Sequence, residues 1–457
     1  MSKPSRHSVL LTDLYELTMA AAYFENNFHA TASFELFVRT LPPERAYLLT
    51  AGLEPALDFL ESLRFAPAEI DYLRRHPVFR HVRDDFFDYL KSFRFTGEVW
   101  AIPEGTPAFG EEPLLRVTAP IIEAQIVETF LLTTLTFQTL IATKAARVVE
   151  AAQGRGVVEF GTRRAHGPEA GVLAARAAYI GGCIGTSNVE AGFRFGIPTY
   201  GTVAHSFVMA YGDEEESFRQ FQRVFPDHAV LLVDTYDTLA AVDKIIQLGL
   251  RPTGVRLDSG DLVELSRAVR RRLDQAGYTD TKIFASGDLN EHAIAAALAR
   301  GASVDFFGVG TELATSKDAP ALGGVYKLVE VRAGSEPAYR AKLSEDKVTY
   351  PGCKQVFRFL DPQGFYHHDV IARADEQYAD PEALLKCVAR GGRRTASSPP
   401  LPDIQQRARK NLARLPARYR QLRHAPPYPV RPSPALENLL EEVRQRILQP
   451  VAKKNRS

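Results

Sequence analysis

Short apolar runs alternate with segments of helical periodicity between Gly154 and Lys327, and this alternation constrains the fold more than any other feature. The apolar runs are GVVEF, IPTYGTV, AVLLV, TGVRL, TKIFA and SVDFFGV. The segments of helical periodicity are Pro168–Ile180, Asn188–Phe195, Asp213–Phe225, Thr238–Leu248, Leu262–Ala276 and Glu291–Arg300. Such alternation predicts a parallel sheet with right-handed helical crossovers. We therefore expect residues 131–327 to form an irregular TIM-like α/β barrel.

Polar or glycine-rich residues follow each apolar run, where the expected strand ends. They are Glu159 to Arg163, His205 with Ser206, Asp234, Arg256 with Asp258 and Asp261, Ser286 to Asp288, and Gly308 to Thr311. In α/β folds the loops after the carboxyl ends of the strands form the functional face, because helices cover the rest. The sequence therefore predicts a single site along this edge.

The flanking segments have a different pattern. Residues 1–130 mix helical segments with alternating strands and predict an α+β N-terminal domain. Short antiparallel-type strands in 328–372 should return to that domain and make it discontinuous. Residues 373–457 should form a helical C-terminal extension, in which Pro381–Ala389 is expected to be a short helix.

Two further helices are expected before the barrel. Leu11–Asn26 has helical spacing and carries Tyr15, which on sequence alone is read as a core tyrosine. Glu123–Glu150 contains no proline or glycine and should form a long helix leading into the barrel. Its Lys144 and Arg147 should face either solvent or the site.

Composition limits the classes of partner. The net charge of +1 gives no global attraction to nucleic acid or acidic membranes. No apolar run approaches the roughly 20 residues of a membrane span, and the first residues lack a signal-peptide core. We therefore expect a cytoplasmic protein that binds neither membranes nor nucleic acid. The basic segment Arg390–Arg423 contains no interleaved aromatic stacking motif, which favours surface helices or a subunit contact over a nucleic-acid patch.

Cysteine and histidine spacing argues against a metal bound by the protein alone. Cys183, Cys353 and Cys387 lie far apart and form no CxxC pair, so neither a disulfide scaffold nor a cysteine zinc site is expected. His367 and His368 are adjacent, and neighbours in a regular strand point to opposite faces. We therefore predict no metal site built from the protein alone.

Several strand-end residues suit phosphate chemistry. The turns Ser286-Gly287-Asp288 and Gly308-Val309-Gly310-Thr311 can present backbone amides to phosphate groups. Asp258 could serve the site, cap the following helix, or do both. His205 is a lone histidine, which can be interpreted either as a structural residue or as a nucleophile at the strand ends.

Eight motifs in order resemble the nicotinate phosphoribosyltransferase family. They are TDLYELTMA, EFGTRRAHGP, GTVAHSF, GVRLDSGDL, ASGDLNE, FGVGTELATS, GGVYKLVE and VTYPGCKQVFR. The likeness runs from about Leu11 to Leu360, with a weaker match in the tail. It supports closure of the barrel, for which only six clear strands are visible.

The resemblance implies roles for individual residues in binding the base. Tyr15 of a neighbouring subunit and Phe160 would stack on the pyridine ring. The resemblance therefore replaces the interpretation of Tyr15 as a core residue. Arg256 would reach the polar substituent of the base. Arg163 and Thr202 would also contact nicotinate.

The resemblance also implies how the other substrates are handled. Asp258 would bind the ribose hydroxyls, and His205 would be phosphorylated by ATP. Arg163, Thr349 and the two glycine turns would hold phosphoribosyl pyrophosphate. Mg²⁺ would enter with the substrate phosphates, ATP would be a co-substrate, and a homodimer would share its active sites. Cys353, in YPGCK, departs from the family pattern and puts the contacts of that loop in doubt.

Substrate choice is expected to depend on Ser187. Related enzymes that use nicotinamide carry an aspartate at the matching position, and a buried aspartate would repel the nicotinate carboxylate. The resemblance therefore favours ATP-coupled synthesis of nicotinate mononucleotide, the first step of NAD synthesis from nicotinate. The alternatives are a nicotinamide or quinolinate phosphoribosyltransferase, and a catalytically silent homologue that acts as a scaffold.

Overall fold

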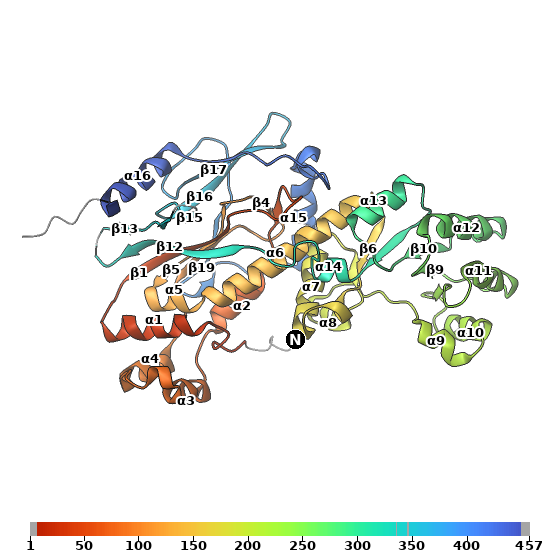
Figure 1. Ribbon diagram of the computed structural model, residues 1–457, viewed down its shortest axis with the longest axis horizontal. Coiled ribbons are helices and arrows are strands. Elements are labelled where there is room, and N and C mark those ends of the chain that lie inside the picture. The colour runs from red at the N-terminus through yellow and green to blue at the C-terminus, as the bar shows by residue number, and fades with distance from the viewer. Residues whose placement is uncertain (1–6, 335, 345–346, 449–457) are drawn as a thin grey trace, which may run out of the picture.

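The computed structural model describes residues 7–334, 336–344 and 347–448. Antiparallel strands lie on one side of the molecule and parallel strands on the other (Figure 1). The long helix α6 (Glu128–Ala151) runs between the two regions (Figure 1).

A seven-stranded sheet forms the antiparallel region, in the order β13-β12-β1-β5-β3-β19-β20. Its strands are β1 (Thr31–Val38), β3 (Glu98–Ala101), β5 (Pro113–Pro120), β12 (Gly324–Arg332), β13 (Ala338–Tyr339), β19 (Lys386–Arg390) and β20 (Arg393–Arg394). β1 pairs antiparallel with both β5 and β12. This α+β region is therefore discontinuous in sequence. The domain boundaries expected after residues 130, 327 and 372 remain predictions.

The prediction of a helix over Pro381–Ala389 is wrong. This segment contains β18 (Glu382–Ala383) and most of β19, which pairs antiparallel with β3. Alanine, leucine and lysine favour helix, but such propensity is weak and tertiary pairing overrides it. Hydrogen bonding to β3 therefore decides the conformation, and the C-terminal part of the chain is not purely helical.

The helices of the antiparallel region pack around its apolar core. They are α1 (Leu14–Glu25), α2 (Leu53–Ser62), α3 (Pro67–Arg75), α4 (Asp84–Ser92), α5 (Ile121–Ile126) and the 3-10 turn η1 (Pro77–Phe79). A small sheet of β2 (Leu48–Leu49) and β4 (Pro107–Ala108) adjoins them. The helix expected over Glu123–Glu150 is present as α5 followed by α6, with a break at Val127.

Lys144 and Arg147 of α6 face neither solvent nor the strand-end residues. Both side chains are buried and form ion pairs with Glu291, at 2.6 and 3.0 Å. Lys144 also pairs with Asp318 at 2.8 Å. These charges sit in the interior because each has a charged partner within hydrogen-bonding distance.

A six-stranded parallel sheet forms the second region, in the order β7-β6-β11-β10-β9-β8. Its strands are β6 (Gly156–Glu159), β7 (Gly185–Thr186), β8 (Val230–Leu232), β9 (Gly254–Leu257), β10 (Lys282–Ala285) and β11 (Phe306–Val309). Five of these strands coincide with predicted apolar runs. The helices around them are η2 (Thr162–Arg164), α7 (Pro168–Ile180), α8 (Val189–Phe195), α9 (His205–Tyr211), α10 (Glu214–Val224), α11 (Thr238–Gln247), α12 (Leu262–Gln275), α13 (Glu291–Ala299) and α14 (Thr311–Ala314).

The sixth predicted strand, Ile197–Val203, is not a strand of the sheet. The two-residue strand β7 occupies that edge, and Thr199 makes only an isolated bridge to Thr186. The carbonyl of Pro198 accepts a hydrogen bond from the Thr186 amide at 3.1 Å. Proline cannot donate to a ladder, so the segment runs beside β7 without extending the sheet. His205 consequently begins helix α9 and does not end a strand.

The parallel region has the α/β architecture expected of a TIM-like fold, with helices packed along its strands. Within the described part of the chain, no ladder joins β8 to β7, so the hydrogen-bonded sheet is open between these strands. Closure into a barrel remains a prediction.

The remaining elements lie on the antiparallel side or between the two regions (Figure 1). A four-stranded sheet has the order β18-β16-β17-β21, with β16 (Lys354–Leu360), β17 (Tyr366–Arg373) and β21 (Val430–Pro432). β14 (Leu343–Ser344), β15 (Lys347–Val348), α15 (Leu401–Arg414), η3 (Ala417–Tyr419) and α16 (Pro434–Leu448) complete the fold. No helix among the described residues combines the length and apolarity that a membrane span requires.

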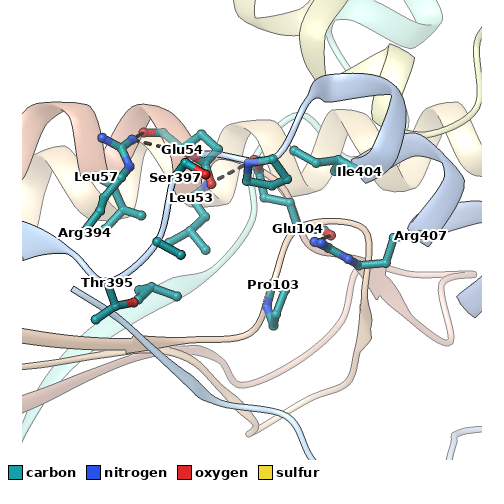
Figure 2. Close-up of a pocket in the computed structure, with 13 residues that line it drawn as sticks. Leu53, Glu54, Leu57, Pro103, Glu104, Arg394, Thr395, Ser397, Ile404 and Arg407 are labelled. Atoms are coloured by element: carbon teal, nitrogen blue, oxygen red, sulfur yellow. Dashed lines mark hydrogen bonds and ion pairs between the residues drawn. The ribbon is translucent and has the colours of Figure 1, made fainter.

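A buried ion pair links the two regions. Arg176 of α7 forms two hydrogen bonds of 2.7 Å with Glu104, and both side chains are almost fully buried. Glu104 also accepts hydrogen bonds from the amides of Gly52 and Leu53 at the start of α2. Glu104 and Leu53 line a pocket together with Arg407 of α15 (Figure 2).

We predict that Arg176→Met lowers the free energy of unfolding by about 3–5 kcal/mol, because Glu104 would keep its charge in the interior without its cationic partner. Chemical denaturation measures the change. Arg194→Met is the matched control, since Arg194 pairs with Glu169 at the surface and should lose less than about 1 kcal/mol. Equal losses in the two variants would contradict a special contribution from the buried pair.

Candidate active site

Arg256, at the end of β9, is held by three neighbouring side chains. Its Nε donates to Ser286 Oγ at 2.8 Å, its Nη1 to Thr202 Oγ1 at 2.8 Å, and its Nη2 to Asp258 Oδ1 at 2.7 Å. Ser286 follows β10, and Thr202 lies in the segment beside β7. The structure therefore brings residues from distant parts of the sequence together where the parallel strands end. We call this place the strand-end rim, or the rim.

Asp258 lies at the centre of this group. Besides Arg256, the hydroxyl of Ser286 donates a hydrogen bond to its Oδ1. Burial alone would raise the pKa of Asp258, but the hydrogen bond from Ser286 and the charge of Arg256 outweigh burial and hold the pKa below its ordinary value. The helix-cap reading does not hold for Asp258, because Asp261 caps α12 instead.

His205 faces two carboxylates. Its Nδ1 lies 3.1 Å from Thr235 Oγ1, and its Nε2 lies 3.9 Å from both Asp234 Oδ1 and Asp258 Oδ2. The His205 side chain is 42% exposed. A partly exposed imidazole with one nitrogen held by a neighbour can act as a nucleophile or as a proton carrier.

Asp234 follows β8, and the resemblance assigns no role to it. Its side chain is only 2% exposed, and its Oδ2 accepts hydrogen bonds from the Asp258 amide at 3.0 Å and from Ser259 Oγ at 2.6 Å. Its Oδ1 is buried and has no hydrogen-bond partner among the described residues. Buried polar atoms in native proteins are usually hydrogen-bonded, so an unpaired oxygen that faces His205 indicates a functional role. In the sequence, the position of Asp234 after an apolar run was the signal that could have identified it.

Phe160 forms an apolar wall next to Arg256. The guanidinium carbon of Arg256 lies 5.8 Å from the centre of the Phe160 ring. A side chain at Gly308 would lie 2.5 Å from that ring, so glycine is needed there for close packing. The glycine-rich strand end therefore has a packing role besides its expected role in phosphate binding.

The two predicted phosphate turns lie on neighbouring strands. Gly287 has φ of +110°, a conformation that favours glycine, and Asp288 beside it is exposed. Gly310 caps the short helix α14, whose first residue is Thr311. β10 and β11 are paired in parallel, so both turns open at the same edge as Arg256.

Arg163 and Ser187 are exposed after β6 and β7, which lie at the opposite side of the strand order from β9 and β8. Arg163 lies in η2, directly after β6, and Ser187 follows β7. The Ser187 amide donates to the Glu159 carbonyl at 2.9 Å, while the buried Glu159 carboxylate accepts a hydrogen bond of 2.6 Å from Thr186. Burial raises the pKa of Glu159, which hydrogen bonds from Thr186 and Gly161 oppose. This network fixes the backbone that carries Ser187.

Tyr15 and Thr349 do not reach this edge within one chain. Tyr15 lies on α1, far from β9 and β10 (Figure 1), and its side chain is 47% exposed, so it is not a core tyrosine. Thr349 directly follows β15 on the same side of the molecule, buried and hydrogen-bonded to the Lys342 amide at 2.9 Å. Neither residue therefore lies at the strand ends of its own chain.

The carboxylates at the rim could assist a metal that arrives with its own oxygen ligands. Within the part of the chain that the structure describes, no three histidine, cysteine, aspartate or glutamate residues are grouped to hold a metal ion. Mg²⁺ keeps several waters and is commonly held by one or two carboxylates together with substrate phosphates. Asp234 and Asp258 fit that pattern.

Family models match most of the chain. The nicotinate phosphoribosyltransferase N-terminal domain matches residues 10–136, and the nicotinate phosphoribosyltransferase C-terminal domain matches residues 377–440. Residues 141–319 match the C-terminal domain of quinolinate phosphoribosyl transferase, and this segment contains all six parallel strands.

Individual relatives match over almost their whole length. Nicotinate phosphoribosyltransferase pncB2 of Mycobacterium tuberculosis is 47% identical, over 90% of this chain and 89% of the relative. Nicotinate phosphoribosyltransferase of Bacillus subtilis is 41% identical, over 92% of each chain. The crystal structure of human nicotinic acid phosphoribosyltransferase superposes with a TM-score of 0.82 at 30% identity, covering 94% of this chain and 99% of that chain. The chain therefore belongs to the nicotinate phosphoribosyltransferase family.

Proposed function

We propose that the chain transfers the phosphoribosyl group of phosphoribosyl pyrophosphate to nicotinate, and that ATP hydrolysis through His205 drives the synthesis of nicotinate mononucleotide. The observation that carries this proposal is the convergence of Arg256, Asp258 and His205 on one edge of the parallel sheet. The three free cysteines suit a reducing compartment, and we place the reaction in the cytoplasm.

The base would bind against Phe160. A pyridine ring stacked on Phe160 lies within reach of the Arg256 guanidinium, whose planar donors match a carboxylate. Stacking contributes about 0.5–1.5 kcal/mol beyond burial, which orients the ring but does not distinguish acid from amide. Arg163, Thr202 and Ser187 would supply the remaining contacts, and a neutral Ser187 leaves the nicotinate carboxylate unopposed.

Asp258 would bind the ribose hydroxyls. Its lowered pKa keeps it ionised at neutral pH, so it can accept hydrogen bonds and offset positive charge that develops on the ribose. Ser286 to Asp288 and Gly308 to Thr311 would hold the phosphates through backbone amides. Mg²⁺, when bound, would neutralise the leaving pyrophosphate, and Asp258 and Asp234 would help to hold it.

His205 would accept the γ-phosphoryl group of ATP. With the Nδ1 proton donated to Thr235 Oγ1, Nε2 carries the free lone pair, attacks phosphorus and releases ADP. Water later cleaves the N–P bond and returns the neutral imidazole. Asp234 Oδ1, buried and without a hydrogen-bond partner among the described residues, would stabilise the positive charge that the ring gains.

Tyr15 would join the site from a partner subunit, and the expected contact of Thr349 with phosphoribosyl pyrophosphate remains a prediction. Tyr15 is half exposed on α1 and remote from the rim of its own chain. A homodimer in which each α1 reaches the partner's strand ends would place Tyr15 opposite Phe160, with the base between them. We therefore propose two shared sites in each dimer.

A nicotinamide-using enzyme is the second candidate, and Ser187 disfavours it. The silent-homologue alternative is disfavoured because the rim keeps an ionised carboxylate, a bound arginine and an exposed histidine. A base other than nicotinate as the preferred substrate would refute the proposed specificity.

We predict that ATP labels the protein with acid-labile, base-stable phosphate, and that His205→Ala abolishes both the label and the stimulation of transfer by ATP. Phosphate analysis after acid and base treatment measures the label. His205→Ala should still bind phosphoribosyl pyrophosphate, because Asp258 and the glycine turns remain. Labelling that persists in His205→Ala would place the phosphorylated residue elsewhere.

Asp234→Asn provides the matched control for this labelling experiment. It keeps His205 but removes the buried charge that faces Nε2. We expect slower labelling, by about tenfold or more, with the site of labelling unchanged. An unchanged labelling rate would restrict Asp234 to holding the backbone of Asp258 and the hydroxyl of Ser259.

We predict that Tyr15→Ala and His205→Ala subunits complement each other. After subunit exchange, a mixed dimer contains one site with intact copies of both residues, so ATP-stimulated activity should recover to as much as about one quarter of the wild-type level. This value assumes random pairing, which places half of the subunits in mixed dimers with one intact site in two. Mixed dimers that are demonstrably formed but remain inactive would contradict shared sites.

A further inference from the structure

His367 and His368, on β17, lie together despite being neighbours in a strand. In the pairing of β16 with β17, Phe359 lies opposite His368 and Leu360 opposite Tyr366, so His367 is an extra residue in a β-bulge. Bulges re-aim side chains. The Nδ1 atoms of the two imidazoles consequently lie 2.7 Å apart, which regular strand geometry would not allow.

Two arginines from other elements approach the same place. Arg431 of β21 has its Nη2 at 3.1 Å from Nε2 of His368, and Arg418 lies in η3. With Pro429 and Val430, the two histidines and two arginines line a surface hollow of about 270 Å³. Its walls, all within the described part of the chain, contain no carboxylate.

The positive charge of the hollow is not neutralised nearby. Neither Arg418 nor Arg431 forms an ion pair with a carboxylate of the described residues. Arg418 donates a hydrogen bond to the Tyr419 hydroxyl at 3.1 Å, and its guanidinium carbon lies 4.7 Å from the centre of that ring. The adjacent Asp369 is fully buried and bound to Arg358 at 2.6 Å and to the Tyr428 hydroxyl at 3.0 Å. Its charge is therefore compensated within the interior.

The His368 ring is held in place. It stacks on Phe359 with ring centres 4.7 Å apart and parallel planes. Burial, followed by the charges of Arg431 and His367, lowers the pKa of His368, and Asp369 opposes this shift. An anion bound in the hollow would offset the effect of these two positive charges on the pKa of His368.

We propose that this hollow binds a small tetrahedral oxyanion of the phosphate class, at a site separate from the strand-end rim. Arginine forks and imidazole N–H groups are donors suited to phosphate oxygens. The volume lies just below the roughly 300–1,000 Å³ of pockets for drug-sized ligands, so a phosphate group fits better than a whole nucleotide. β16 and β17 lie well apart from β9 and β10 (Figure 1), so the hollow is separate from the strand ends of the same chain.

Histidine-selective labelling of the full chain provides the test. Inorganic phosphate is titrated while the Cε1–H signals of the histidines are followed by NMR, with His367→Gln used to assign the pair. We expect saturable shifts of His367 and His368 and a rise in the pKa of His368. Sulfate, which stays dianionic between about pH 5 and 8, should bind more tightly as pH falls, because protonation of His368 adds a donor and a charge.

Arginine variants distinguish this hollow from the phosphate turns of the rim. Arg431→Gln or Arg418→Gln should weaken the response of His367 and His368 by about tenfold or more, because each removes a charged donor. The exposed Arg409 supplies the control, and Arg409→Gln should bind as the wild type does. Any response of His205 to phosphate should persist in all three variants. Unmoved His367 and His368 signals, or equal responses in Arg431→Gln and wild type, would overturn the proposal.

Pyrophosphate and ATP identify the source of the phosphate group. Responses to these compounds alongside a response to inorganic phosphate support recognition of the phosphate group itself. A response to ATP alone, with none to phosphate or sulfate, would contradict an oxyanion site, because the hollow would then recognise the nucleoside.

Discussion

The guanidinium of Arg256 organises the strand-end rim, because its donors bind side chains from three loops at once. Thr202, Asp258 and Ser286 each accept one of its hydrogen bonds at 2.7 to 2.8 Å. A lysine could not reproduce this, since its single ammonium lacks a planar fork of donors. The arrangement fixes Asp258 relative to Phe160 before any substrate arrives, and such preorganisation is a large part of what an active site contributes.

Charge is unevenly compensated at the rim, and this has a functional meaning. Asp258 is matched by Arg256, whereas the buried Oδ1 of Asp234 faces His205 without a hydrogen bond from the described residues. An unsatisfied buried acceptor costs about 1–3 kcal/mol, so its presence calls for a compensating role. Positive charge on His205, or a cation that enters with the phosphates, would provide it. A positively charged group bound next to Asp234 would therefore be stabilised by this carboxylate.

The sequence predicted the parallel strands well because each is a short apolar run followed by a polar end. β8 to β11 and the residues after them lie where that pattern placed them. It failed at the edge strand. Ile197–Val203 is more apolar than β7, but Pro198 has no N–H to donate to a ladder. The two residues of β7 are too few for any pattern to detect. The histidine pair shows the same limit, because a bulge depends on pairing with β16 and is invisible in a linear pattern. For the site, the roles of Tyr15 and Thr349 came from the resemblance alone. Neither residue follows a strand of the parallel sheet, so the position of polar residues at strand ends could not have identified them.

The most direct test of the central claim is the identity of the nucleotide formed. The protein is incubated with phosphoribosyl pyrophosphate and Mg²⁺, and nicotinate, nicotinamide or quinolinate is supplied separately, each with and without ATP. The account predicts nicotinate mononucleotide from nicotinate, more of it with ATP, and little or no nucleotide from the other two bases. Preferential conversion of nicotinamide or quinolinate, or no nucleotide from any base, would contradict it.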